Sequence, residues 1–300
     1  APSVGSMGFD VAIAFVWFWR CGAPAAAELA LEALPRAVPL IAVTDDLHWR
    51  RDAKTQFCNM SEAIKRREVA VYRRAALTLT ITAEDAHELR AQLPKLRLGV
   101  LPYALDGTPP PGAARGWGER GGVLYVGSGH HANRRAVRWL LRGVWPKVRK
   151  AAGGANLTLT LVGSERWAAE AKEAAAGADD IVCHGAVDDL EPYVARARVV
   201  VAPAVVASGL STKTFLALRH GVPLVTTPLG LRGLFAARTA GAIAVGKTAD
   251  PFADAVVALH SNRTRWEAQR AAARGHAERH LGPAPLRRAL RGALAGVVDG

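Results

Sequence analysis

The chain has 300 residues, which suits about two domains and excludes a small fold held together by disulfide bonds. Half of the residues are hydrophobic and 22% are charged, a composition that excludes intrinsic disorder. The net charge of +13 comes mostly from arginines scattered along the whole chain. This scatter argues against a specific nucleic-acid partner and leaves open only a loose contact with an anionic surface.

The first part of the sequence alternates between short apolar runs and longer segments with helical periodicity. This alternation predicts βαβ units around a parallel sheet that is buried on both faces. We expect strands at 10–18, 39–44, 77–82 and 98–101, and helices at 24–34, 61–75 and 83–93. The first apolar run ends at Arg20 and has no basic segment before it, so we expect neither a transmembrane helix nor a signal peptide. A cytoplasmic location is the resulting expectation.

The alternation stops at residues 106–122, where six glycines and three consecutive prolines exclude a regular helix or strand. We place the interdomain linker here, and we expect a first domain at 1–117 and a second at 118–300. The first would hold about four strands and the second about six. The first domain is therefore expected to be incomplete, as if truncated at its amino terminus.

The second half resumes the alternation directly after the linker. We expect strands at 122–126, 157–162, 181–184, 199–202, 223–227 and 242–245, and helices at 132–152, 166–176, 188–195, 211–220, 251–260, 263–280 and 284–297. The predicted fold class is α/β, with two Rossmann-like, doubly wound parallel-sheet domains. Ligands of such sheets bind beyond the carboxyl ends of the strands, so the loops at those ends are the candidate sites.

One candidate loop follows the first strand of the second domain. Gly127 and Gly129 would let a ligand approach the main chain, and Ser128, His130 and Asn133 would supply polar contacts. A dehydrogenase is disfavoured, because Ala132 stands where the dinucleotide fingerprint needs its third glycine. A tight strand-to-helix turn without a ligand explains the same glycines and is the alternative interpretation.

The other candidate loop leads into the helix that follows the fourth strand of the second domain. Ser211 is expected to cap this helix, and Gly221 would end it. The N–H groups of Leu210, Ser211 and Thr212 would lie beside the Lys213 ammonium at the positive end of the helix dipole. This combination predicts an anion site suited to a diphosphate, with a solvated lysine beside an ordinary cap as the alternative.

These loops belong to a longer resemblance. Residues 123–281 are similar to the donor-binding domain of retaining glycosyltransferases of family 4, which have the two-domain GT-B fold. The motifs that carry the resemblance are Gly127 with His131-Ala132-Asn133 and Trp139, Leu159 to Gly163, His184 to Leu190 with Tyr193, and the block from Val201 through Gly209, Lys213, Gly221-Val222-Pro223 and Thr227 to Gly230-Leu231-Arg232-Gly233-Leu234. In the first half, the stretch from Thr44 to Arg51 is similar to the segment by which many members place a His or Asp at the domain cleft.

The resemblance implies an enzyme that moves a sugar from a nucleotide-diphosphate sugar to an acceptor, with retention of configuration and without a metal. His48 and Lys213 would be its catalytic residues. The residues implied in donor binding are Gly127, Ser128, Gly129, Asn133, Gly185, Ala186, Val187, Gly209, Leu210, Ser211 and Thr212. The nucleotide sugar is a co-substrate, no further cofactor is expected, and a glycan, a lipid or a protein would be the acceptor.

One position departs from the pattern of the family. Members usually carry a Glu that binds the donor ribose in the helix after the Gly-rich turn, and Leu216 occupies the matching position here, with Ser208 at the partner acidic position. A ribose hydroxyl beside a leucine would go unpaired, at a cost of about 1 to 3 kcal/mol. The alternative function is therefore a noncatalytic module that binds a nucleotide sugar or a partner.

The remaining patterns predict no separate site. Acidic pairs at 45–46, 179–180 and 188–189 are more typical of helix caps and solvated turns than of metal sites. Cys21, Cys58 and Cys183 lie far apart and lack the spacing of zinc or redox motifs.

Overall fold

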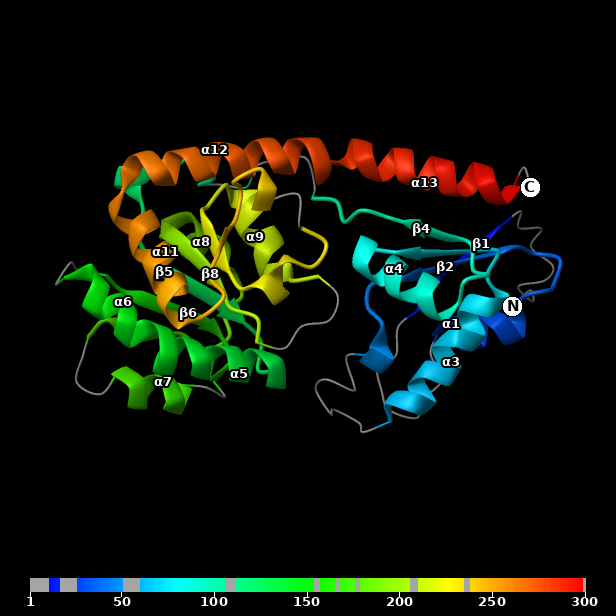
Figure 1. The fold of residues 1–300 in the computed structure, drawn as a ribbon, viewed down its shortest axis with the longest axis horizontal. Coiled ribbons are helices and arrows are strands. Elements are labelled where there is room, and N and C mark those ends of the chain that lie inside the picture. The colour runs from blue at the N-terminus through cyan, green and yellow to red at the C-terminus, as the bar shows by residue number, and fades with distance from the viewer. Residues whose placement is uncertain are drawn as a thin grey trace. The chain divides into compact units, whose positions relative to one another are not determined.

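The computed structural model describes residues 11–16, 26–50, 60–105, 110, 112–153, 157–165, 168–175, 179–205, 210–234 and 238–298. The chain forms two compact units, each built around a parallel sheet (Figure 1). The first unit comprises Ala1–Ala104, Ser208–Leu210 and Pro283–Gly300, and the second comprises Leu105–Ala207 and Ser211–Gly282. None of the described helices is long and apolar enough to span a membrane.

The first unit contains a four-stranded parallel sheet in the order β1-β2-β3-β4. Its strands are β1 (Ala12–Phe15), β2 (Leu40–Thr44), β3 (Leu77–Thr80) and β4 (Leu98–Val100). Its helices are α1 (Ala26–Ala33), α3 (Ser61–Arg74), α4 (Ala83–Gln92) and α13 (Pro283–Val298). The central strand β2 is buried along its whole length, as expected for a strand covered on both faces.

The two faces of this sheet are covered by different helices. On one face, Ala42 of β2 belongs to a buried cluster with Ile64 of α3 and Leu89 of α4. On the other face, its neighbours Ile41 and Val43 pack with Val297 of α13. Successive strand residues point to opposite faces, so both faces of β2 need a cover. The last helix therefore belongs to the first unit, whereas the sequence interpretation had counted it with the second domain.

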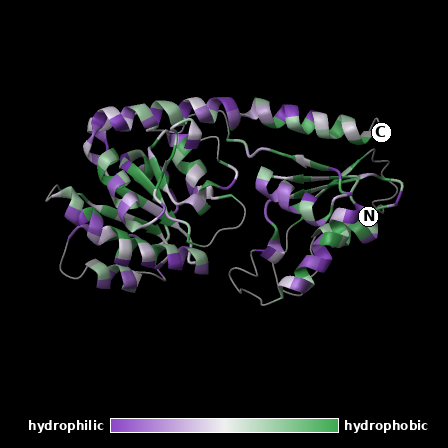
Figure 2. Ribbon diagram, viewed as in Figure 1, coloured by the Kyte–Doolittle hydropathy of each residue, from purple (hydrophilic) through white to green (hydrophobic). Residues whose placement is uncertain are grey.

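The second unit contains a six-stranded parallel sheet in the order β10-β9-β8-β5-β6-β7. Its strands are β5 (Gly121–Gly127), β6 (Leu159–Gly163), β7 (Ile181–Cys183), β8 (Ala197–Ala202), β9 (Leu224–Thr226) and β10 (Ala244–Val245). Its α-helices are α5 (His131–Trp139), α6 (Trp145–Ala152), α7 (Ala168–Ala175), α8 (Glu191–Arg196), α9 (Thr212–His220), α11 (Ala249–Ser261) and α12 (Arg263–His280), and its shorter helical segments are η2 (Trp117–Glu119), η3 (Leu140–Val144) and η5 (Pro228–Leu231). Figure 2 shows the strands of this sheet mainly in the hydrophobic colour.

The main core of the second unit lies on one face of its sheet. Val123 of β5 and Val199 of β8 pack there with Trp145 of α6 and Phe252 of α11. Leu124, the neighbour of Val123, points to the opposite face and is also buried. The strands are thus buried on both faces, which is the arrangement that their continuous apolar sequences predicted.

The helix expected at 132–152 is continuous but irregular. The α-helical segments α5 and α6 are joined by η3, a segment of wider π-type winding. Pro146 is the second residue after η3, and a proline has no N–H to donate to the carbonyl four residues earlier. The wider turn ends where this hydrogen bond is lost, and it places Leu140, Leu141 and Val144 in the core.

Hydrogen bonds from Arg120 hold the glycine-rich segment before β5 against the rest of the second unit. Arg120 is buried, and its guanidinium donates to the main-chain oxygens of Gly112 (2.9 Å), Arg115 (3.1 Å), Val194 (2.9 Å) and Ala197 (3.2 Å). These bonds link the carbonyl groups of this segment to those of Val194 in α8 and Ala197 in β8. The compact units consequently divide between residues 104 and 105, whereas composition had suggested a boundary at 117.

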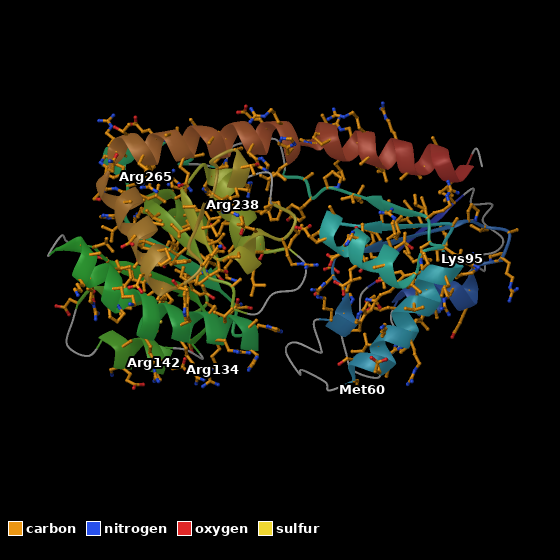
Figure 3. The ribbon with its side chains drawn as sticks, in the orientation of Figure 1. Met60, Lys95, Arg134, Arg142, Arg238 and Arg265 are labelled. Carbon is orange, nitrogen blue, oxygen red and sulfur yellow. The ribbon has the colours of Figure 1, made fainter. Side chains whose placement is uncertain are left out.

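Many of the arginines of the second unit are paired on its surface. Arg134 and Arg138 of α5 share the carboxylate of Glu170, and Arg142 of η3 pairs with Glu173. Figure 3 shows Arg134 and Arg142 projecting outward from their helices. These ion pairs neutralise part of the positive charge where it occurs.

Candidate functional site

The sheet of the second unit reverses its strand order between β5 and β8. From β5 the sheet continues through β6 and β7 in one direction, and from β8 it continues through β9 and β10 in the other. At such a point the segments that follow the two strands lead to opposite faces of the sheet, which leaves a crevice beyond their carboxyl ends. The fold therefore marks this edge as the place for a ligand.

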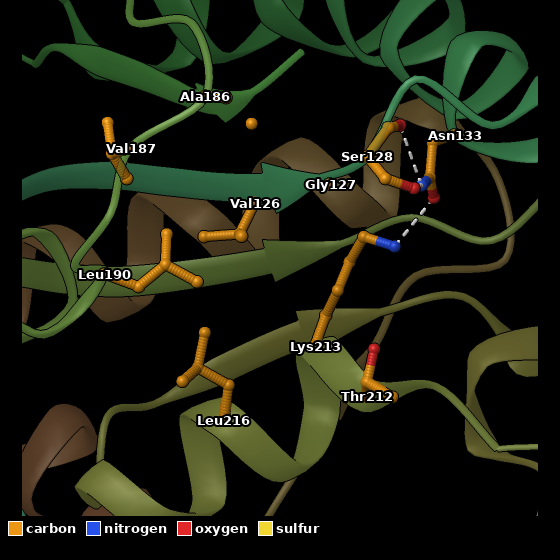
Figure 4. A pocket seen from close by; sticks show the side chains of 11 residues that line it. Val126, Gly127, Ser128, Asn133, Ala186, Val187, Leu190, Thr212, Lys213 and Leu216 are labelled. Carbon is orange, nitrogen blue, oxygen red and sulfur yellow. Dashed lines mark hydrogen bonds between the residues drawn. The ribbon is translucent and has the colours of Figure 1, made fainter.

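A pocket of about 460 Å³ lies at this edge, within the second unit. It is lined by Val126, Gly127, Ser128, Asn133, Gly163, Ala186, Val187, Leu190, Thr212, Lys213 and Leu216. The lining comes from the ends of β5 and β6, from the segments that follow β5 and β7, and from the first half of α5 and of α9 (Figure 4). Its volume is within the range of small-molecule sites, roughly 300 to 1,000 Å³.

A polar network occupies one end of the pocket. Nζ of Lys213 donates to Oδ1 of Asn133 at 2.7 Å, and Nδ2 of Asn133 donates to the carbonyl oxygen and the hydroxyl of Ser128 at 3.0 and 3.1 Å. The Lys213 ammonium also lies 5.7 Å from the centre of the Tyr125 ring, within range of a cation–π contact. Figure 4 shows Lys213 directed toward Asn133.

Burial of the Lys213 side chain disfavours its charged form. Removal from water lowers the pKa of Lys213 to about 8, because burial disfavours the ammonium form. Asn133 supplies a dipole but no full negative charge to compensate. An anion bound beside the ammonium would supply that charge, so the residue is suited to receive a negatively charged ligand.

The helix α9 presents different residues to the core and to the pocket. Phe215 and Leu218 are buried in the protein, whereas Lys213 and Leu216, three residues apart, line the pocket. Gly221 ends the helix with a φ of 58°, as predicted from its position. Ser211 occupies the N-cap position, but its side chain makes no capping hydrogen bond, which corrects the expectation. The amide groups of the first turn are thus left without that cap.

Gly163 and Gly127 allow the ends of β5 and β6 to approach each other closely beside the pocket. Gly163 has a φ of 137°, and a Cβ there would overlap the carbonyl oxygen of Gly127 in the neighbouring strand. A side chain at position 163 would therefore force β5 and β6 apart at the floor of the pocket. Only glycine fits both the backbone conformation and the space.

The structure brings together most of the residues that the sequence singled out in the second unit. The predicted residues that line the pocket are Gly127, Ser128, Asn133, Ala186, Val187, Thr212 and Lys213. Gly129, Gly185, Leu210 and Ser211 are described but lie outside the lining, and Gly209 lies outside the described residues. Sequence reasoning had not selected Val126, Gly163 and Leu190, although Gly163 ends a strand as Gly127 does.

His48 lies in the first unit, shortly after β2, and is held by a buried carboxylate. Its Nδ1 is 2.6 Å from Oε1 of Glu68, a fully buried residue of α3. The same carboxylate accepts the main-chain N–H groups of His48 (3.1 Å) and Trp49 (3.2 Å). A carboxylate in this position favours a proton on Nδ1 and fixes the orientation of the ring.

Sequence reasoning had not selected Glu68, although a signal was present. It falls on the apolar stripe of α3, between the buried residues Ile64 and Val71. A charged residue on such a stripe is rarely buried without a partner. Its partner here is the imidazole of His48, 20 residues earlier in the chain.

The acidic pairs take part in local structure. Oδ1 of Asp189 accepts the N–H of Glu191 at the start of α8 (2.8 Å), as a cap does. Asp180 pairs with Arg149 and accepts the indole N–H of Trp145 at 2.9 Å. Among the residues that the structure describes, no three His, Cys, Asp or Glu side chains gather as metal ligands do.

The sequence matches a family model over the second unit. Residues 120–262 match the model described as "Glycosyl transferases group 1". This range includes every residue that lines the pocket. No curated protein matches the chain in sequence.

Solved structures of glycosyltransferases share the architecture. HepE of Anabaena, in complex with UDP and glucose, aligns with a TM-score of 0.67 and 14% identity over 90% of this chain and 74% of that one. Sucrose-phosphate synthase of Thermosynechococcus elongatus aligns with a TM-score of 0.65 and 16% identity over 86% and 67% of the two chains. The pneumococcal O-GlcNAc transferase GtfA, in complex with UDP and GlcNAc, aligns with a TM-score of 0.64 and 15% identity over 91% and 55%. The expected α/β fold with two parallel-sheet domains, GT-B, is confirmed.

Proposed function

We propose that this protein transfers a sugar from a nucleotide-diphosphate sugar to an acceptor. The observation that carries the proposal is the position of the Lys213 ammonium, held by Asn133 in a pocket where the strand order reverses. The family match over residues 120–262 and the shared fold support it. Two of the matched structures are complexes with UDP and a sugar.

Each part of the pocket suits one part of such a donor. Lys213 and the first turn of α9 would hold the diphosphate, because an ammonium and a helix N-terminus both stabilise negative charge. Gly127 and Gly163 would allow the ligand to approach the main chain closely. The main-chain groups of Ala186 and Val187 would meet the base.

The same residues would act on the reaction itself. Negative charge grows on the diphosphate as its bond to the sugar breaks, so the attraction of Lys213 strengthens in the transition state. We therefore assign stabilisation of the leaving group to Lys213 and α9 rather than to a metal ion. We further propose that the configuration at the transferred sugar's anomeric carbon is retained, as in the glycosyltransferases of family 4.

The first unit would contribute His48. Its buried ring is oriented by Glu68, and its Nε2 lies 4.0 Å from Oδ1 of Asp45. The role proposed for His48 is to orient the donor sugar or the acceptor. The acceptor is proposed to be a glycan, a lipid or a protein. Gly129, Gly185, Leu210 and Ser211, which lie outside the lining, and Gly209, which lies outside the described residues, are also proposed as donor contacts.

A second candidate function is nucleotide-sugar binding without transfer. The observation that favours it is Leu216, which lines the pocket with an apolar side chain one helical turn from Lys213. A donor whose ribose is not hydrogen-bonded there would be held less firmly. Binding without turnover is the behaviour that distinguishes this function.

Isothermal titration calorimetry with UDP, GDP and ADP, and then with their sugar conjugates, tests the proposal. We expect saturable binding that Lys213→Ala weakens at least about tenfold. The control is Lys172→Ala, which removes an exposed lysine of α7 and should leave the affinity unchanged. Release of nucleotide diphosphate in the presence of acceptors separates a transferase from a binding module. Nucleotide binding that survives Lys213→Ala unchanged would contradict the assignment of the diphosphate to Lys213, and a wild-type chain that binds none of the nucleotides would contradict both functions.

A further inference from the structure

The lining of the pocket divides into a polar end and an apolar wall. The polar end consists of Ser128, Asn133, Thr212 and Lys213, and the apolar wall consists of Val126, Val187, Leu190 and Leu216. Figure 4 shows Leu190 and Leu216 lying away from the contact between Lys213 and Asn133. The two ends would therefore contact different parts of one ligand.

The apolar wall is available to a ligand. Val126, Val187, Leu190 and Leu216 are each half-buried, so part of every one of these side chains faces the open pocket. Hydrocarbon side chains neither donate nor accept hydrogen bonds. Within the described lining, this wall thus offers no side-chain partner for a hydroxyl group.

The helix sets which part of a nucleotide meets this wall. Leu216 lies three residues after Lys213 on α9, a rise of about 4.5 Å along the same helix face. In a nucleoside diphosphate the pentose is bonded directly to the first phosphate. When Lys213 holds the diphosphate and the base extends toward Ala186 and Val187, the pentose lies against Leu216 and Leu190.

We infer that this pocket does not select for the 2′-hydroxyl group, so that the affinity for a 2′-deoxyribonucleoside diphosphate is within threefold of that for its ribonucleotide counterpart, or higher. A site that hydrogen-bonds a ligand hydroxyl rejects the analogue that lacks it by a factor of about 10⁴ or more. An apolar wall cannot do so, and it disfavours an added hydroxyl by about 100-fold at most. Leu216 and Leu190 are the specificity-determining residues, and the inference rests on the proposed function.

Calorimetry on the full chain, at one pH and one salt concentration, tests this with three matched pairs: UDP and dUDP, GDP and dGDP, ADP and dADP. In each pair that binds, the deoxy form is expected to have a Kd from tenfold lower than that of the ribonucleotide to no more than threefold higher. Leu216→Glu, which adds an acceptor, should shift the preference toward the ribonucleotide by at least tenfold. Leu216→Met keeps the wall apolar and should retain the wild-type ratio.

The outcomes separate this inference from the proposed function. Tight binding of a ribonucleotide, with the deoxy form more than threefold weaker in the wild-type protein, overturns the inference and leaves nucleotide binding intact. Failure of all six nucleotides to bind overturns the proposed function and this inference together. Because both results come from the wild-type chain, neither depends on the folding of a variant.

Discussion

Nζ of Lys213 lies 2.7 Å from Oδ1 of Asn133, a residue 80 positions earlier in the chain. Both Asn133 contacts to Ser128 use its amide nitrogen, so Oδ1 is left facing the lysine. The contact joins the start of α5 to the start of α9 across the point where the strand order reverses. It holds the ammonium at the polar end of the pocket.

The first prediction concerns Asn133. Asn133→Ala removes the acceptor that holds Lys213, and we expect the affinity for a nucleotide diphosphate to fall about tenfold. Asn133→Asp keeps an acceptor but adds a negative charge where the diphosphate would bind, so it should weaken binding further. Calorimetric titration measures both. Asn262→Ala, which removes the cap of α12 instead, should lower stability but not affinity. Equal affinities of Asn133→Ala and wild type would refute the positioning role.

The second prediction concerns pH. The pKa of Lys213 is lowered to about 8 by burial, and only its protonated form attracts a diphosphate. Affinity should therefore fall as the pH rises through 8 and beyond. A bound diphosphate favours the charged form and raises the pKa, so binding near pH 8 should take up protons. Titrations in buffers of different ionisation enthalpy measure this uptake, and Lys213→Ala should abolish it. An affinity that stays constant from about pH 7 to 9.5 contradicts the prediction.

The third prediction concerns Gly163. Gly163→Ala forces an L-residue into a φ of 137° and places a Cβ against the carbonyl oxygen of Gly127. We expect the free energy of unfolding of the second unit to fall by at least about 2 kcal/mol. Urea titration followed by tryptophan fluorescence measures the loss. Gly118→Ala is the matched control, because a Cβ there meets nothing within 4 Å. If the two variants unfold at the same urea concentration, the close approach of β5 and β6 is not as described.

The fourth prediction concerns Glu68. Glu68→Ala leaves the buried N–H groups of His48 and Trp49 and the His48 ring without their acceptor. We expect the first unit to lose at least about 3 kcal/mol of stability. Glu68→Gln retains a carbonyl oxygen and should lose less. Thermal unfolding measures the stability of each variant, and we expect it to decrease from wild type to Glu68→Gln to Glu68→Ala. Glu62→Ala, on the exposed side of the same helix, should unfold like the wild type, and a similar result for Glu68→Ala would rule out the proposed support of His48.

The regular elements were predictable because their signals are local. The expected strand at 39–44 is β2 (Leu40–Thr44), and the expected helix at 61–75 is α3 (Ser61–Arg74). A buried strand needs a continuous apolar run, and an amphipathic helix needs an apolar stripe with its own period. Both patterns can be read within about a dozen residues, without knowledge of the contacts they make.

The candidate site was predictable only in part. Gly127 and Lys213 were selected because a glycine at a strand end allows close approach to the main chain, and a lysine at a helix start adds positive charge to that of the helix N-terminus. Leu190 carried no such signal, since leucines are common and most of them are buried in cores. Ser211 shows the opposite error. Its residue type and its N-cap position both predict a capping hydrogen bond, but that bond forms only when the side-chain hydroxyl points to the helix N–H groups, and here it makes none.

By itself, the sequence determined the α/β class, the order of strands and helices, and the loops in which a ligand site would lie. Only the tertiary structure decided that α13 packs against β2 of the first unit, that Arg120 fastens the segment before β5 to the second, and that Lys213 meets Asn133. The first group depends on the periodicity of neighbouring residues. The second depends on contacts between residues tens to hundreds of positions apart, and a local pattern carries no information about which distant partner a side chain will meet.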